Sequence, residues 1–248
     1  MVRQVENVGP LLEVCVDDVA GMQAAIAGGA DRIELCTALA CGGLTPPMGL
    51  MELASEAPIP VFAMIRPRSG SFVFSRDEIR LMIADITAAR RARLAGVVLG
   101  ASLIDGRLDC DVLRQLVEAA DGMDLTLHRA FDLVPDQLTA LVEAQSLGFR
   151  RILTSGGQMT AREGLDALKQ LVSASQGRTS IMPGGGVSVD NLSDFATFGM
   201  VEFHASCSSL ATPVPRLVRF GFELEMRRMT DERRVRSMKN RILQIFAR

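Results

Sequence analysis

Asp31-Arg-Ile-Glu-Leu-Cys36 alternates apolar and polar side chains, and this alternation decides the fold. Successive side chains of a β-strand point to opposite faces, so Ile33 and Leu35 face one way, and Arg32, Glu34 and Cys36 face the other. A parallel strand covered by helices on both faces of an open sheet is apolar throughout. The alternation therefore favours a closed barrel, in which the apolar face meets an outer helix and the polar face points into the interior.

The rest of the chain repeats this unit of a strand followed by a helix. We expect eight strands with about seven helices between them. The strands are predicted at residues 11–16, 31–36, 61–65, 95–100, 123–128, 151–154, 179–182 and 200–203. Eight such units fit the 248 residues of the chain, because a parallel (β/α)8 barrel has about 250. We predict one α/β domain over residues 1–248, with the barrel at about 11–209 and an eighth helix and a tail in 210–248.

Composition narrows the classes of partner. A formal net charge of -2 gives no electrostatic reason to expect nucleic acid or an acidic membrane. The chain has no run of roughly 18 apolar residues, as a membrane span would need, and residues 1–10 hold no signal-peptide core. The expected location is therefore cytoplasmic. The five cysteines are then expected to be reduced thiols or metal ligands. Lys169 and Lys239, the only lysines, fall in predicted outer helices, which argues against a Schiff-base mechanism.

More polar side chains are predicted to face the barrel interior than a plain core would hold. They are Glu13, Cys15, Arg32, Glu34, Cys36, Arg66, Thr126, His128, Glu202 and His204. One interpretation is a structural network in which the three glutamates neutralise Arg32 and Arg66. The other is a catalytic cluster at the C-terminal ends of the strands, where barrels carry their active sites. Its candidate members are Glu34, Arg66, His128, Asp132 and His204.

An anion site is predicted at the same end of the barrel. Barrels commonly bind phosphate with backbone N–H groups after strands seven and eight, where this chain has a glycine triplet and a serine-rich segment. Arginines after strand three could reach the anion, because a guanidinium offers a fork of donors to two oxygens. Solvated arginines are the alternative. The predicted anion-binding residues are Arg66, Arg68, Gly184, Gly185, Gly186 and Ser206.

Two cysteines suggest a metal site. Cys15 and Cys36 lie on the same face of neighbouring predicted strands, so two thiolates could converge on a soft ion such as Cu(I). Buried, inert thiols are the alternative. Zinc is disfavoured, because the chain has no C-x-x-C or H-x-x-x-H spacing.

A series of motifs in this chain resembles the CutC family. In order they are Leu12-Glu-Val-Cys15, Ala30-Asp-Arg-Ile-Glu-Leu-Cys36, Gly42-Gly-Leu-Thr-Pro46, Ile65-Arg-Pro-Arg68, His128-Arg-Ala-Phe-Asp132, Leu153-Thr-Ser-Gly156, Pro183-Gly-Gly-Gly-Val187 and Glu202-Phe-His204. The resemblance implies a TIM barrel and a copper homeostasis protein, with copper binding attributed to the cysteines that match Cys15 and Cys36. Ser69-Gly-Ser71 replaces a Gly-Gly-Asp of the family, so no role of that aspartate is carried over.

Two classes of function follow. The resemblance implies a Cu(I)-binding homeostasis protein that depends on Cys15 and Cys36. The Glu, Arg and His cluster instead indicates a barrel enzyme acting on a small anionic or phosphorylated metabolite. A homodimer is also expected, because apolar residues recur after Pro215 at Phe220 and Phe222 with little left to pack on in a finished barrel.

Overall fold

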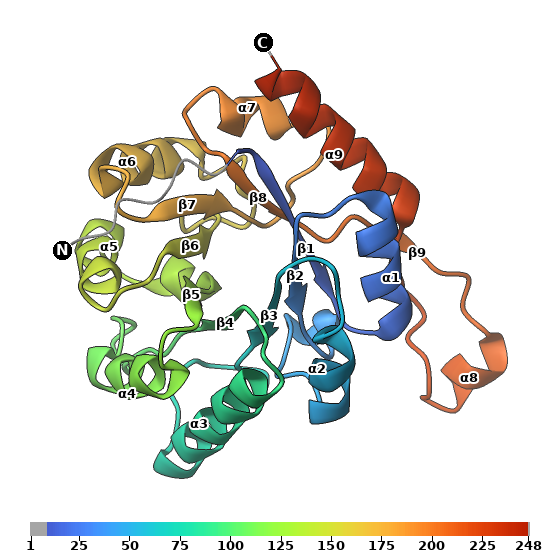
Figure 1. Ribbon diagram of the computed structural model, residues 1–248, viewed down its shortest axis with the longest axis horizontal. Coiled ribbons are helices and arrows are strands. Elements are labelled where there is room, and N and C mark those ends of the chain that lie inside the picture. The colour runs from blue at the N-terminus through green and yellow to red at the C-terminus, as the bar shows by residue number, and fades with distance from the viewer. Residues whose placement is uncertain (1–8, 248) are drawn as a thin grey trace.

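Eight parallel strands alternate with helices around a TIM barrel in the computed structural model, which describes residues 9–247 (Figure 1). Each strand from β1 to β6 pairs with the next along the chain, β8 pairs with β1, and β7 lies beside β8. The strands are β1 (Leu11–Val16), β2 (Arg32–Leu35), β3 (Val61–Met64), β4 (Gly96–Leu99), β5 (Asp124–Leu127), β6 (Arg151–Thr154), β7 (Ser180–Pro183) and β8 (Glu202–Ala205).

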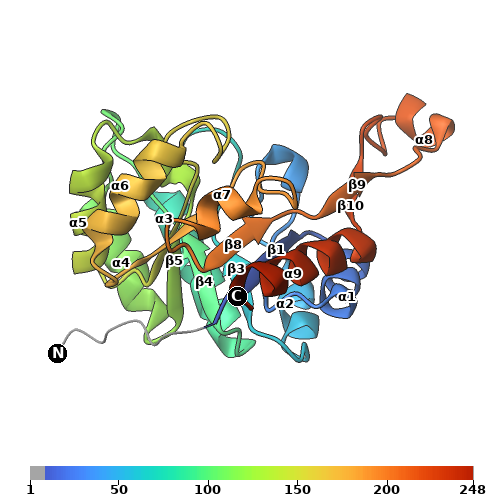
Figure 2. The same cartoon turned by 90° about the horizontal axis from the view of Figure 1, so that it is seen from above.

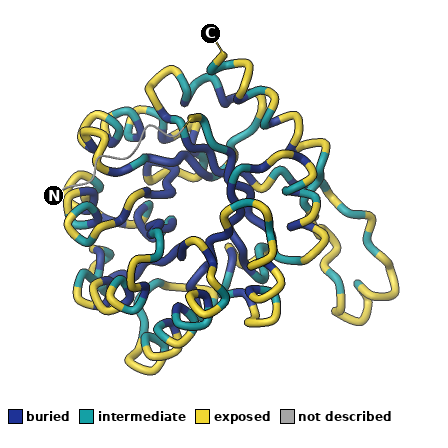
Figure 3. Tube along the Cα trace, viewed as in Figure 1, coloured by how far each residue is buried: buried dark blue, intermediate teal, exposed yellow. Residues whose placement is uncertain are grey.

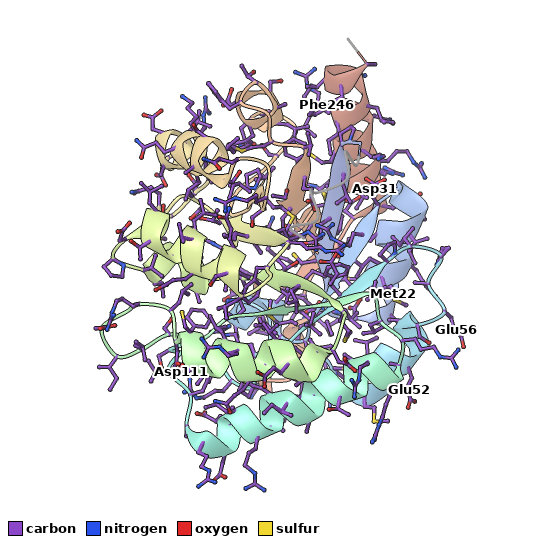
Figure 4. All side chains as sticks on the ribbon, turned by 60° about the vertical axis from the view of Figure 1, so that its left-hand side comes forward. Met22, Asp31, Glu52, Glu56, Asp111 and Phe246 are labelled. Atoms are coloured by element: carbon purple, nitrogen blue, oxygen red, sulfur yellow. The ribbon has the colours of Figure 1, made fainter. Side chains whose placement is uncertain are left out.

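The helices of the outer ring follow the predicted order, and several of them begin at recognisable N-terminal caps. Asp18 accepts a hydrogen bond from the Gly21 N–H, and Ser75 and Glu78 form a capping box. Charged side chains such as Glu52, Glu56 and Asp111 lie on the outside of the ring (Figure 4). The helices are α1 (Val19–Gly28), α2 (Met48–Ala54), α3 (Arg76–Arg91), α4 (Cys110–Ala120), α5 (Gln137–Ser146), α6 (Leu165–Ser175), α7 (Leu192–Ala196) and α9 (Glu232–Phe246), with short 3-10 turns η1 (Leu39–Cys41) and η2 (Arg129–Leu133).

Strand periodicity sorts side chains as the sequence predicted. Ile33 and Leu35 are fully buried between barrel and helices, whereas the alternate positions Arg32 and Glu34 point inward. Buried residues accordingly line the strands, and exposed ones lie on the helices (Figure 3). The predicted strand boundaries agree to within one residue except for the eighth strand, which was placed at 200–203 and lies two residues later.

A network of ion pairs fills the N-terminal part of the barrel interior. Arg32 contacts the carboxylates of both Glu13 and Glu202, and Arg151 donates to Glu202 at 3.0 Å and to Asp124 at 3.0 Å. The guanidiniums of Arg32 and Arg151 lie 5.1 and 5.0 Å from the centroid of the Phe62 ring. The predicted structural network therefore exists and includes Arg32. The proposed partnership with Arg66 is wrong, because Arg151 takes that place.

The last part of the chain divides into an arm and a covering helix. The arm, residues 208–230, contains β9 (Ser208–Leu210), α8 (Pro215–Arg219) and β10 (Arg228–Thr230), and it projects away from the barrel (Figure 2). Helix α9 instead returns to pack on α1 and β1 and buries three apolar side chains. Among residues 9–247, no helix has both the length and the apolar character needed to span a membrane.

We propose that the arm mediates self-association, as a homodimer. Phe220, Phe222, Leu224 and Met226 are 57–79% exposed, and their burial against a second copy would remove a large apolar surface from water. Light scattering at micromolar concentration should then give about twice the 26.8 kDa mass of one chain. Serine substitutions at Phe222 and Met226 should return the single-chain mass. A parent protein that already has this mass would contradict the proposal.

Candidate functional site

A small cavity lies at the C-terminal mouth of the barrel. Its volume is 210 Å³, and its polar lining comes from the ends of several strands or the residues just after them. Cys15 and Glu34 lie opposite each other on β1 and β2, and His204 lies opposite Glu13 on β8. The polar lining consists of Cys15, Glu34, Arg66, His128, Arg129 and His204. Four of the five predicted catalytic residues thus meet in one cavity.

Three of these residues form a potential metal-binding trio. One ligand atom each of Cys15, Glu34 and His204 lies within 4.8 Å of the other two. The His204 Nδ1 atom is hydrogen-bonded to Glu13 Oε1 at 2.8 Å, which orients the ring so that Nε2 faces Glu34 Oε2 at 3.8 Å. A carboxylate on the remote imidazole nitrogen is the usual way to fix a metal-binding histidine.

Buried charges around the trio stabilise one another. Burial opposes the ionisation of Glu13, yet Arg32 and His204 hold its pKa well below the ordinary value. Burial would likewise lower the pKa of His204, but Glu34, Cys15 and Glu13 outweigh it and raise this pKa above the ordinary value. Burial raises the pKa of Glu34. A metal ion bound here would therefore displace protons from its ligands.

Cys36 lies behind Glu34. Its side chain is fully buried beside Phe62, Met64 and Val98, and its thiol donates to Glu34 Oε2 at 3.5 Å. Burial, and then the neighbouring Glu34 carboxylate, raises the pKa of the Cys36 thiol well above the ordinary value. The trio thus contains only one of the two cysteines in the predicted metal site.

His128 is held as a neutral imidazole. Burial, with a further contribution from Arg66, lowers the pKa of His128 to about 3. The backbone N–H of Ala130 donates to His128 Nδ1 at 3.2 Å. Since Nδ1 accepts, the ring proton lies on Nε2. His128 therefore presents a hydrogen-bond donor and no positive charge at neutral pH.

Arg66 is buried, and two of its nitrogen atoms donate hydrogen bonds to backbone carbonyls. Its Nη1 atom donates to the carbonyls of Cys41 and Gly43 at 2.9 and 3.2 Å, and Nη2 donates to the Gly70 carbonyl at 3.1 Å. These bonds tie the loops after β2 and β3 together. The Nε–H, which has no partner among residues 9–247, and the second hydrogen of Nη2 remain to serve a ligand.

Two predicted site residues, Arg68 and Asp132, hold loops in place and do not line the cavity. Arg68 pairs with Glu78 at 2.5 Å and donates to three loop carbonyls, including those of Ser69 and Ser71. The Asp132 carboxylate accepts from Arg129 Nε at 2.6 Å and from Ser155 N at 2.9 Å. Both side chains hold loops at the mouth, and neither lines the 210 Å³ cavity.

Two of the predicted anion-binding glycines lie against residues of the mouth cavity. Gly185, with a φ of 90°, lies against Arg129, since a Cβ atom there would be 3.1 Å from the guanidinium. Gly184 allows Leu153 to pack closely, and Gly186 accepts from Asn191 at 2.8 Å. Ser206 lines a second groove of 780 Å³ between the mouth and the arm, which shares Cys15 and Leu39 with the mouth cavity. A common anion site of these segments with Arg66 and Arg68 stays a prediction.

Comparisons with known proteins agree with the resemblance that the sequence motifs indicated. The CutC family model matches residues 10–209. The chain belongs to the CutC family. A family protein CutC from Rhizobium meliloti (strain 1021) is 56% identical over 93% of this chain and 95% of its own length. The human copper homeostasis protein cutC homolog is 45% identical over 81% of this chain and 74% of its own. The crystal structure of CutC from Streptococcus agalactiae superposes with a TM-score of 0.76 at 33% identity, covering 79% of this chain and 98% of that chain.

Two functional features of this CutC chain were missed from sequence. Glu13 was taken only as a neutralising charge, although it also orients His204. Arg151 was placed at the start of a strand without an inward role. Arg151, Leu153 and Ser155 occupy every second position and so share one face of that strand. This shared face was the available signal.

Proposed function

We propose that this CutC protein binds Cu(I) at the barrel mouth through Cys15 Sγ and His204 Nε2, with the Glu34 carboxylate beside them. The convergence of one sulfur, one nitrogen and one oxygen atom within 4.8 Å carries the proposal. Thiolate is a soft ligand that favours Cu(I), and imidazole also suits copper. The names of the human and streptococcal relatives, which refer to copper homeostasis and to CutC, support the same ion.

The proposal replaces one ligand of the site expected from sequence. Cys36 is hydrogen-bonded to Glu34 and favours the protonated thiol, so it is a weaker candidate for a first ligand. His204 is already oriented by Glu13 and needs only to lose the proton on Nε2. In this proposal copper is the ion that the protein carries.

Competition titration against a Cu(I) chelator tests this proposal. Cys15→Ser should abolish stoichiometric binding, because it removes the only thiol of the trio. His204→Gln should weaken binding by more than the roughly 10- to 100-fold that loss of an outer-sphere partner costs. Cys41→Ser is the matched control, since that thiol is exposed, and it should leave binding unchanged.

Two outcomes would contradict the proposal. A Cys15→Ser variant that bound one copper as tightly as the parent would move the site elsewhere. Loss of binding in Cys36→Ser together with full binding in His204→Gln would instead favour the two-thiol site.

A further inference from the structure

Three buried polar atoms at the mouth cavity have no hydrogen-bond partner among residues 9–247. They are Glu34 Oε1, Arg66 Nε and His128 Nε2. Their residues are 3%, 7% and 3% exposed, and all three line the 210 Å³ cavity. A buried polar atom without a partner destabilises the fold, so three such atoms in residues that line one cavity indicate a ligand that would satisfy them.

The chemistry of these atoms is defined by their other contacts. His128 Nε2 carries a proton because Nδ1 accepts from Ala130, and Arg66 Nε is a permanent donor. Glu34 Oε2 is used by Cys36, which leaves Oε1 to accept. These three atoms thus offer two donors and one acceptor.

The two donors are fixed in place by close packing. The Phe72 ring lies 4.8 Å from the His128 ring, and the Arg66 guanidinium lies 5.0 Å from the centroid of Phe72. His128 also lies over Gly100, where a Cβ atom would come within 2.5 Å of the ring. Glycine at position 100 therefore makes room for the imidazole at this position.

Copper binding leaves this arrangement unexplained. An ion on Cys15, Glu34 and His204 could satisfy a Glu34 oxygen, but a cation gives nothing to the donors of Arg66 and His128. These donors need an oxygen acceptor, and Arg66 adds a positive charge beside it.

We infer that the mouth cavity binds a small α-hydroxy acid. Its carboxylate accepts from Arg66 Nε and His128 Nε2, and its neighbouring hydroxyl donates to Glu34 Oε1. A volume of 210 Å³ is below the roughly 300 to 1,000 Å³ of typical ligand pockets, which restricts the ligand to a few carbon atoms. The inference goes beyond metal binding and gives the enzyme hypothesis a ligand class, with Arg66, His128 and Glu34 in place of the glycine segment and Ser206.

Calorimetric titration of the metal-free parent protein, kept in a copper chelator, tests this inference. Lactate should bind saturably and at least about tenfold more tightly than propionate, which lacks only the hydroxyl that Glu34 would receive. Lactate should also raise the melting temperature with concentration. This comparison needs no variant and is independent of the Cu(I) titration.

Variants of His128 provide the second measurement. His128→Phe removes the donor and should weaken lactate binding by about tenfold, whereas His128→Gln keeps an N–H near the position of Nε2 and should restore most of it. Equal binding of lactate and propionate, or no saturable binding of either, would overturn the inference. Equal lactate affinity in parent and His128→Phe would remove His128 from the site and overturn it as well.

Discussion

Arg32→Met should lower the free energy of unfolding by about 3 to 5 kcal/mol, because it leaves the buried carboxylates of Glu13 and Glu202 without their shared cation. Arg32 is 3% exposed, and Glu13 and Glu202 are 0% and 6% exposed. Urea unfolding at neutral pH should show the loss as a lower midpoint with an unchanged slope.

The loss of stability in Arg32→Met should depend on pH, and the direction of this dependence tests the explanation. Burial opposes ionisation of Glu13 and Glu202, yet Arg32 lowers the pKa of each below the ordinary 4.5. Groups with a lowered folded pKa stabilise the fold above the ordinary pKa and lose that contribution as pH falls through the folded value. The difference between parent and Arg32→Met should therefore be largest at neutral pH and shrink in acid.

An exposed ion pair supplies the matched control for Arg32. Arg80 pairs with Asp77, and both side chains are mostly exposed. Arg80→Met should cost at most about 1 kcal/mol. A loss of the same size in both variants, or a loss for Arg32 that does not change between neutral and acidic pH, would contradict the view that Arg32 neutralises buried carboxylates.

Local periodicity was sufficient to predict the barrel. The alternation in β1 and β2 placed Glu13, Cys15 and Glu34 inside, and each lies there. The histidines were correctly assigned to strand ends, because chain position along a parallel strand determines which end a residue occupies. These features depend on short-range pattern, which a single sequence contains.

The partners of each charge could not be predicted in the same way. Arg66 turns to backbone carbonyls of two loops, and Arg68 turns to Glu78, because loop geometry offers acceptors that the sequence does not reveal. The arm was also missed. Its strands β9 and β10 are short and pair across a long connection, so the alternation in residues 220–226 was assigned to an unpaired tail.

Deleting residues 231–248 should prevent the barrel from folding, although the family match ends at residue 209. Helix α9 buries Val235, Met238 and Ile242, each worth about 1.5 to 3 kcal/mol. It packs so closely on α1 that a Cβ atom on Gly28 would lie 2.5 Å from Val235. The combined loss approaches the total stability of a domain, about 5 to 15 kcal/mol. Circular dichroism and solubility of the shortened protein should report an unfolded or aggregated chain.

Removal of the arm is the control for this deletion. Leu210 on β9 lies opposite Arg228 on β10, so residues 211–227 can be replaced by an Asn-Gly turn that suits a two-residue hairpin. The armless chain keeps α9 and should remain folded, because within one chain the arm's large apolar side chains are exposed and add nothing to the barrel core. If the arm mediates self-association, this variant should also have the mass of a single chain. A folded protein without α9, or an unfolded one without the arm, would reverse the roles that packing assigns to these two segments.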